Sequence, residues 1–219
     1  MTRTLLAIFA HPDDESFGAG GTLAKYAADG TRVALICATR GEAGIEGMSP
    51  EEAGLVREQE LRTAAATLGL AEVRFLGYGD GELAQADPER VVAQLVSAMR
   101  DIRPHVVITF GPDGISGHSD HVAIHHLATQ AFDQAGLPAQ LYYLAHSEAT
   151  QQGCGVPPPP QTAGEPVVAV DVSAHLVKVQ AMQRHASQNP PYPGQPEEEA
   201  ARMACHEYFA LARLTRQTC

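Results

Sequence analysis

The segment LLAIFAHPDDE, residues 5–15, decides the fold prediction because an apolar run leads directly into a proline. Proline cannot donate to a strand ladder, so the run from Leu5 to Ala10 is predicted to be a buried strand that ends there. A segment opened by Gly18 to Gly21 then continues with good helix formers over Thr22 to Ala28. The next apolar run, RVALICA at residues 32–38, completes a β-loop-α-β unit with a right-handed parallel crossover.

Strand and helix signals continue to alternate along the chain. A capping signature predicts a helix over Ser49 to Leu68, with Gly69 as its C-cap. Further strands are predicted at Glu72–Leu76, Val106–Phe110, Gln140–Ala145 and Val167–Asp171, and helices at Pro88–Ile102, His121–Ala135, Ser173–Ala186 and Glu197–Leu214. Two proline-rich stretches, residues 153–166 and 189–196, are predicted loops. The alternation predicts an α/β fold: one domain, residues 1–219, with a doubly wound, Rossmann-like, mostly parallel sheet and flanking helices.

The composition excludes several classes of partner. The formal net charge of -11 argues against binding to nucleic acid or to an anionic membrane surface, both of which favour a basic protein. No apolar run reaches the 18 residues of a typical membrane span, and no signal-peptide cleavage pattern is visible, so we expect a cytoplasmic protein. The four cysteines lack CxxC spacing, so a metal would have to be held by histidine and carboxylate.

Two segments rich in histidine and aspartate follow two of the predicted strands. His11 to Glu15 comes directly after the first strand, and Gly111 to His121 comes after the strand at Val106–Phe110. In open α/β sheets, ligands bind beyond the carboxyl ends of the strands. We therefore expect these two segments, distant in sequence, to share one crevice.

The residue types in these segments suit metal-assisted hydrolysis. A catalytic zinc takes three protein ligands and keeps one position open for water, and His11, Asp14 and His121 would supply such a set. Asp13, next to a ligand, would then serve as the general base. His118 would polarise the carbonyl oxygen or protonate the leaving amine.

Further roles and simpler alternatives accompany this hypothesis. Asp120 would orient the His118 imidazole and also cap the following helix. Alternatively, His-Pro-Asp-Asp is an ordinary turn, and His118 and His121 are solvated residues of a loop and a helix. His125, one turn after His121, has the spacing of a ligand pair, but without an HExxH glutamate we interpret it as a packing residue.

Several sequence blocks together resemble a known family. They are AHPDDE (10–15), TRGEAG (39–44), VREQEL (56–61), LGYGDGEL (76–83), GPDGISGHSDHVAI (111–124) and KVQAMQRHASQ (178–188). With these blocks the chain resembles the LmbE-like, or PIG-L, family of zinc-dependent de-N-acetylases, which includes the deacetylases of mycothiol and bacillithiol synthesis.

The resemblance implies a role for each residue of the two main motifs. One zinc ion per chain would be held by His11, Asp14 and His121. Asp13 would be the general base, and His118 would stabilise the tetrahedral intermediate or act as an acid. These roles agree with those argued from the chemistry.

Other matched positions carry less certain roles. The resemblance implies that Arg57 and Asp80, the latter in a matching glycine-rich block, bind the substrate, although surface ion pairs are an alternative for both. His185 matches a family position with no assigned role, and helix packing is its alternative. Ser119 stands where the family motif usually has proline, which changes the loop but not the expected ligands.

Several functions remain open at this stage. The first hypothesis is removal of the acetyl group from an N-acetylglucosaminyl conjugate, such as the malate-linked precursor of bacillithiol. An amidase of thiol conjugates, a chitooligosaccharide deacetylase, or a non-catalytic metal- or sugar-binding protein would use the same fold. A base at Asp13 counts against simple binding, and HPDD stands where a flavodoxin-like nucleotide binder would have a glycine-rich loop. The resemblance also implies a homo-oligomer, such as a hexamer.

Overall fold

The computed structural model describes residues 3–145, 167–172, 176–189, 195 and 206–215. The strands are β1 (Thr4–Phe9), β2 (Arg32–Thr39), β3 (Glu72–Tyr78), β4 (Val106–Thr109), β5 (Gln140–Ala145), β6 (Val167–Asp171) and β7 (His206–Leu214). The helices are α1 (Asp14–Ala28), α2 (Pro50–Leu68), α3 (Pro88–Ile102), α4 (Ser119–Ala135) and α5 (Leu176–Arg184), with short 3-10 turns η1 (Leu83–Gln85) and η3 (Ala186–Gln188).

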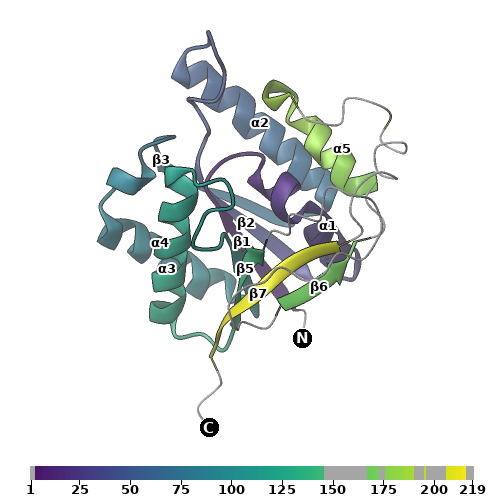
Figure 1. Ribbon diagram of the computed structural model, residues 1–219, viewed down its shortest axis with the longest axis vertical. Coiled ribbons are helices and arrows are strands. Elements are labelled where there is room, and N and C mark those ends of the chain that lie inside the picture. The colour runs from purple at the N-terminus through teal and green to yellow at the C-terminus, as the bar shows by residue number, and fades with distance from the viewer. Residues whose placement is uncertain (1–2, 146–166, 173–175, 190–194, 196–205, 216–219) are drawn as a thin grey trace.

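A seven-stranded sheet in the order β3-β2-β1-β4-β5-β7-β6 forms the middle layer. Strands β1 to β5 are mutually parallel, whereas β7 lies antiparallel between β5 and β6. Helices α1, α2 and α5 pack together on one face, and α3 packs with α4 on the other (Figure 1). The predicted α/β class and the mostly parallel, doubly wound sheet are confirmed.

The strand order places a crevice at one position of the sheet. β1 pairs with β2 on one side and with β4 on the other, so the chain direction across the sheet reverses between β1 and β4. Ligands of doubly wound sheets bind beyond the carboxyl ends of the strands at such a switch point. All of β1 is buried, because helices cover both faces of a parallel sheet, and the core therefore fixes where its carboxyl end lies.

The predicted helix ends are confirmed where the capping chemistry is explicit. The Ser49 side chain accepts from the Glu52 amide at the start of α2, and Gly69 ends the helix in the left-handed conformation. Asp87 caps α3 in the same way by accepting from the Glu89 amide. None of the described helices has the length and apolar character needed to span a membrane.

The first helix begins earlier than predicted. It starts at Asp14 and contains the glycine segment, which was predicted to precede it. A side chain on Gly18 would meet Leu144, and one on Gly21 would meet Val172. These glycines therefore allow close packing of α1 and do not form a turn.

The predicted helix at Glu197–Leu214 is wrong over its last nine residues. These form β7, which pairs with β5 and β6 and buries Tyr208, Phe209 and Ala210. Long-range pairing with two strands overrides local helix propensity here. Residues 197–205, 173–175 and most of the two predicted loops lie outside the described part of the chain.

A buried ion pair joins β7 to two helices. The carboxylate of Glu207 accepts hydrogen bonds from the amides of Gly21 and Thr22 in α1, at 3.0 and 2.8 Å. It also accepts one from Nζ of Lys178 in α5, at 2.6 Å. Both charged side chains are buried, so the contact fixes three segments relative to one another.

Candidate metal and catalytic site

The three residues predicted to bind metal converge beyond β1 and β4. His11 follows β1, Asp14 opens α1, and His121 lies in the first turn of α4. His11 Nδ1 is 3.1 Å from His121 Nε2, which is 3.3 Å from Asp14 Oδ1. The other carboxylate oxygen, Oδ2, is 3.8 Å from His11 Nδ1. The two segments thus meet, as the sequence predicted.

The spacing of these donor atoms suits a tetrahedral metal. Zinc bonds to nitrogen and oxygen of about 2.0–2.1 Å place neighbouring ligand atoms roughly 3.3 Å apart. Asp14 Oδ2 also accepts from the amides of His11 and Ala10, at 2.8 and 3.1 Å, which fixes the carboxylate. Burial opposes ionisation of Asp14, but the contacts from His121 and His11 lower its pKa, so the carboxylate carries the charge that a metal ligand requires.

Hydrogen bonds set the orientation of the His121 ring. Its Nδ1 lies 3.0 Å from the carbonyl oxygen of Gly114, which can only accept, so Nδ1 carries the proton. Burial lowers the pKa of His121, but the Asp14 carboxylate beside Nε2 raises it, so the lone pair of Nε2 becomes available to a metal once the ring gives up its second proton. The Phe110 ring stacks on the imidazole, with 4.1 Å between the centroids.

Two carboxylates flank the other nitrogen of His11. Nε2 is 3.1 Å from Asp80 Oδ1 and 3.2 Å from Asp120 Oδ2. Although burial lowers the pKa of His11, these carboxylates, with Asp14, raise it to about 10. Asp80, predicted to reach substrate, therefore lies against a predicted metal ligand.

The predicted role of Asp120 as a helix cap is wrong. The N-cap of α4 is His118, whose Nδ1 accepts from the Asp120 amide at 3.2 Å. The Asp120 carboxylate instead contacts His11 and accepts from the amides of Gly81 and Leu83, at 2.8 and 3.2 Å. The Asp120 side chain is fully buried, and its contacts join the turn after β3 to the site. The sequence had predicted that Asp120 orients His118.

His118 lies at the exposed rim of the site. Its ring centroid is 4.8 Å from that of His11, and one ligand atom each from His11, His118 and His121 lie within 4.8 Å of one another. Because Nδ1 accepts the Asp120 amide, the proton of the neutral ring is on Nε2. His118 can therefore donate a hydrogen bond from Nε2. A second possible metal group among the described residues is His11 with Asp80 and Asp120.

Asp13 sits in a strained backbone conformation beside the predicted ligands. Its φ is 118°, which costs a non-glycine residue about 1–3 kcal/mol unless its surroundings hold it. Its amide donates to Glu15 Oε2 at 3.1 Å, and its Oδ2 accepts from Arg57 Nη2 at 3.1 Å. Burial and the neighbouring Asp14 raise the pKa of Asp13 to about 7, although Arg57 opposes the shift.

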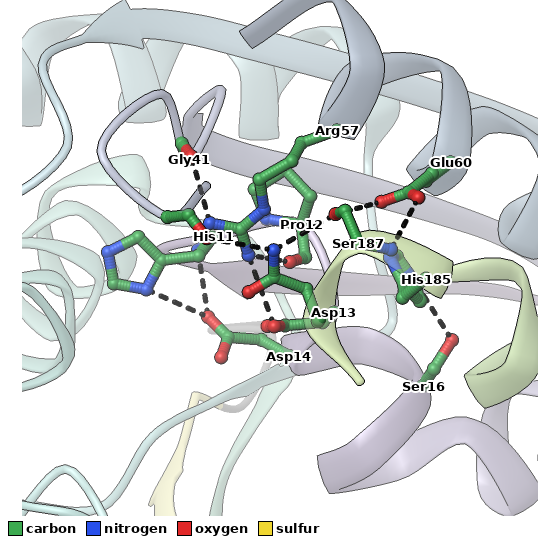
Figure 2. A network of polar contacts seen from close by, with 12 residues as sticks. His11, Pro12, Asp13, Asp14, Ser16, Gly41, Arg57, Glu60, His185 and Ser187 are labelled. Atoms are coloured by element: carbon green, nitrogen blue, oxygen red, sulfur yellow. Dashed lines mark hydrogen bonds and ion pairs between the residues drawn. The ribbon is translucent and has the colours of Figure 1, made fainter. Parts of the chain in front are cut away.

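Arg57 is turned inward onto the HPDD segment (Figure 2). The Arg57 side chain is only 4% exposed. It donates to the carbonyl oxygens of Pro12 and Gly41, at 2.6 and 2.9 Å, and also to Asp13. A side chain on Gly44 would overlap the guanidinium. The structure therefore brings Arg57 to Asp13, where the sequence predicted a contact with substrate.

One buried pair was given no role from the sequence. Glu15 and His185 are both fully buried, and Glu15 Oε1 lies 2.7 Å from His185 Nε2. In the sequence, the signal that could have pointed to Glu15 is its place in the first turn of α1, where the opening residues of the helix are buried. Its partner, 170 residues away, cannot be identified from spacing.

Comparisons with known proteins identify relatives of this chain. Residues 6–132 match the PIG-L family, described as GlcNAc-PI de-N-acetylase. Over 160 residues the chain is 42% identical to the 1D-myo-inositol 2-acetamido-2-deoxy-alpha-D-glucopyranoside deacetylase of Rhodococcus opacus, covering 61% of this chain and 54% of that relative. The chain spans about half the length of the curated relatives it matches.

Two solved structures share the fold over nearly the whole chain. The N,N'-diacetylchitobiose deacetylase of Pyrococcus horikoshii aligns with a TM-score of 0.74 at 23% identity, covering 96% of this chain and 84% of that one. The 4-carboxy-2-hydroxymuconate hydratase of Pseudomonas putida aligns with a TM-score of 0.74 at 21% identity, covering all of both chains. Fold likeness at this identity therefore does not distinguish deacetylation from hydration. The match over residues 6–132, which contains both histidine segments, is specific, and the chain belongs to the PIG-L, GlcNAc-PI de-N-acetylase, family.

Proposed function

We propose that this protein is a metal-dependent hydrolase that removes the acetyl group from the nitrogen of a 2-acetamido-2-deoxyglucoside conjugate. The observation that carries the proposal is the convergence of His11, Asp14 and His121 with Asp13 directly beside them. A site that only binds metal has no need of a strained carboxylate held at its edge by a buried arginine.

In this proposal His11, Asp14 and His121 hold one zinc ion. When bound, zinc supplies a Lewis acid that polarises the amide carbonyl and acidifies water. The ring of His121 is oriented by the Gly114 carbonyl oxygen, and that of His11 by Asp80 and Asp120. Such outer contacts fix the ligands before the metal arrives.

Asp13 acts as the general base. Its side chain is 25% exposed, so it reaches solvent, whereas Arg57 holds one of its oxygens from the buried side. A pKa of about 7 lets the carboxylate accept a proton from the attacking water near neutral pH. The protonated carboxyl then delivers that proton to the leaving amine nitrogen.

His118 stabilises the charge that develops on the acetyl oxygen. Because His118 Nδ1 accepts a hydrogen bond from the Asp120 amide, the neutral ring has its N–H at Nε2, which can donate at the exposed rim of the site. A donor aimed at a developing oxyanion is worth about 10²–10³ in rate.

The relatives guide the choice of substrate. The Rhodococcus opacus protein is named for an inositol-linked 2-acetamido-2-deoxyglucoside, so we place this conjugate first and the malate conjugate of the sequence hypothesis second. Diacetylchitobiose stands third, because the Pyrococcus horikoshii protein shares the fold.

The test is amine release from these three compounds and from free N-acetylglucosamine, with bound metal quantified in the same samples. We expect release from at least one conjugate, loss of release in a chelator, and recovery when zinc is restored. Parallel samples restored with iron identify the effective metal. A protein that binds metal stoichiometrically and releases no amine from any of the four sugars would refute the proposal and favour a binding protein or a hydratase.

A further inference from the structure

A polar chain leads from Asp13 into the interior, away from the predicted metal ligands. The amide of Asp13 donates to Glu15 Oε2 at 3.1 Å, and the other oxygen of Glu15 contacts His185 Nε2 at 2.7 Å. The Ser16 hydroxyl also donates to Glu15 Oε1. Because Glu15, Ser16 and His185 are fully buried, water cannot replace these partners.

The His185 imidazole has few contacts other than the one with Glu15. Within the described residues its Nδ1 has no hydrogen-bond partner, and Nε2 contacts Glu15 and, at 3.5 Å, the Ser16 hydroxyl. Burial alone would lower the pKa of His185, but Glu15 and then Asp13 raise it, so the ring is suited to pair with the carboxylate. A buried carboxylate that loses such a partner must rearrange or take up a proton.

The segment carrying His185 is docked independently of that contact. The Ser187 amide and hydroxyl donate to Glu60 in α2, at 2.8 and 2.6 Å. Gln188 Nε2 donates to the carbonyl oxygen of Gly44, in the loop that lies against Arg57. Removing the His185 side chain therefore leaves other contacts to seat the segment.

We propose that His185 is a positioning residue for Asp13 and acts through Glu15. A positive φ at a non-glycine residue persists only where its neighbours over-determine it. At Asp13, Arg57 fixes the side chain and Glu15 fixes the amide, and His185 holds Glu15 in place. The segment at 185–188 lies outside the matched family residues, 6–132, so a distant part of the chain completes the site. The catalytic consequence rests on the proposed function.

The test compares three variants in the full-length protein. His185→Leu removes the partner of Glu15, His185→Gln retains an N–H donor, and Ser187→Ala removes a contact of the same segment that does not reach Asp13. We expect His185→Leu to lower kcat about 10- to 100-fold with KM and bound metal unchanged. His185→Gln should recover most of the rate, and Ser187→Ala should remain within about twofold of the unmodified protein.

A second readout does not depend on activity. Hydrogen exchange of the Asp13 amide, followed by NMR in the metal-free protein, should accelerate in His185→Leu but not in His185→Gln or Ser187→Ala. The inference fails if His185→Leu leaves this exchange unchanged, or if His185→Leu and Ser187→Ala reduce kcat equally. If the unmodified protein releases no amine from any sugar, the proposed function fails, and the exchange data still decide the role of His185.

Discussion

Arg57 Nη2 donates to Asp13 Oδ2 across 3.1 Å while the arginine itself is only 4% exposed. The same nitrogen donates to the carbonyl oxygen of Pro12, so the guanidinium holds the backbone and the side chain of the HPDD segment together. This geometry separates two roles for the arginine, because substrate binding would act on KM and positioning would act on kcat.

Arg57→Lys tests that distinction. Lysine keeps the charge but loses the planar fork that reaches Pro12, Asp13 and Gly41 together. We expect kcat to fall about 100-fold, since misplacing a catalytic group by about 1 Å costs that much, and KM to change by less than about threefold. Steady-state kinetics measure both kcat and KM. A rise in KM at constant kcat would indicate that Arg57 binds the substrate and does not position Asp13.

Gly44→Ala should act in the same direction without replacing a charged residue. A Cβ at this position would overlap the buried guanidinium of Arg57, which must then move. We expect a loss of about 1–3 kcal/mol in unfolding free energy together with a lower kcat. Gly54→Ala in α2 is the control, because its Cβ meets its neighbours no closer than 3.4 Å. Denaturant titration and kinetics of both variants decide the point, and equal effects would contradict the steric account.

Asp13→Asn should separate metal binding from turnover. The amide is nearly isosteric and leaves His11, Asp14 and His121 in place, so bound zinc should stay near one per chain. Loss of the base should lower kcat by about 10²–10⁴. The measurement is metal content by mass spectrometry beside amine release. Near-normal turnover in this variant would show that another group takes the proton.

His121→Ala provides the opposite pattern. Its Nε2 lies 3.1 Å from His11 Nδ1 and 3.3 Å from Asp14 Oδ1, so it is central to the predicted ligand set. We expect both metal and turnover to be lost while the fold remains, as judged by circular dichroism. Full metal occupancy in His121→Ala would shift the ligand assignment to His118 or to the group of His11 with Asp80 and Asp120.

Metal uptake should release protons. In the metal-free protein the pKa of His11 is about 10, so the ring is protonated at pH 7.5 and must lose its proton to become a ligand. Affinity should therefore rise with pH, by about tenfold per unit for one displaced proton, until the pH approaches that pKa. Calorimetry in buffers of different ionisation enthalpy counts the protons. Asp80→Asn removes one of the carboxylates that raise the pKa of His11, so the pH at which proton release falls off should be lower than in the unmodified protein.

Local signals in the sequence were sufficient for most of the fold. The apolar run before Pro12 and the caps at Ser49, Gly69 and Asp87 mark elements whose ends depend on nearby residues. β7 depends on pairing with β5 and β6, which no local pattern encodes, and it was therefore predicted as a helix.

The same distinction between local signals and long-range contacts applies to the site. His11, Asp14 and His121 were predicted to converge because sheet topology brings strand ends together. The partners of the buried charges were not predictable: Asp120 turns to His11, Arg57 turns to Asp13, and His185 pairs with Glu15. Each of these contacts depends on side-chain direction across segments far apart in the chain, which spacing does not show.

The contact of Glu207 with α1 and Lys178 ties the order of folding to the last strand. Glu207 is separated by 186 residues from Gly21 and by 29 from Lys178, and both charged side chains are buried. Seating β7 with the Glu207 carboxylate fully hydrogen-bonded therefore requires both helices to be in place, because opening α1 removes two amide donors and opening α5 removes Lys178. The helix that begins at Asp14 should thus gain its full protection only after β7 has been synthesised, and α1 and β7 should unfold as one cooperative unit.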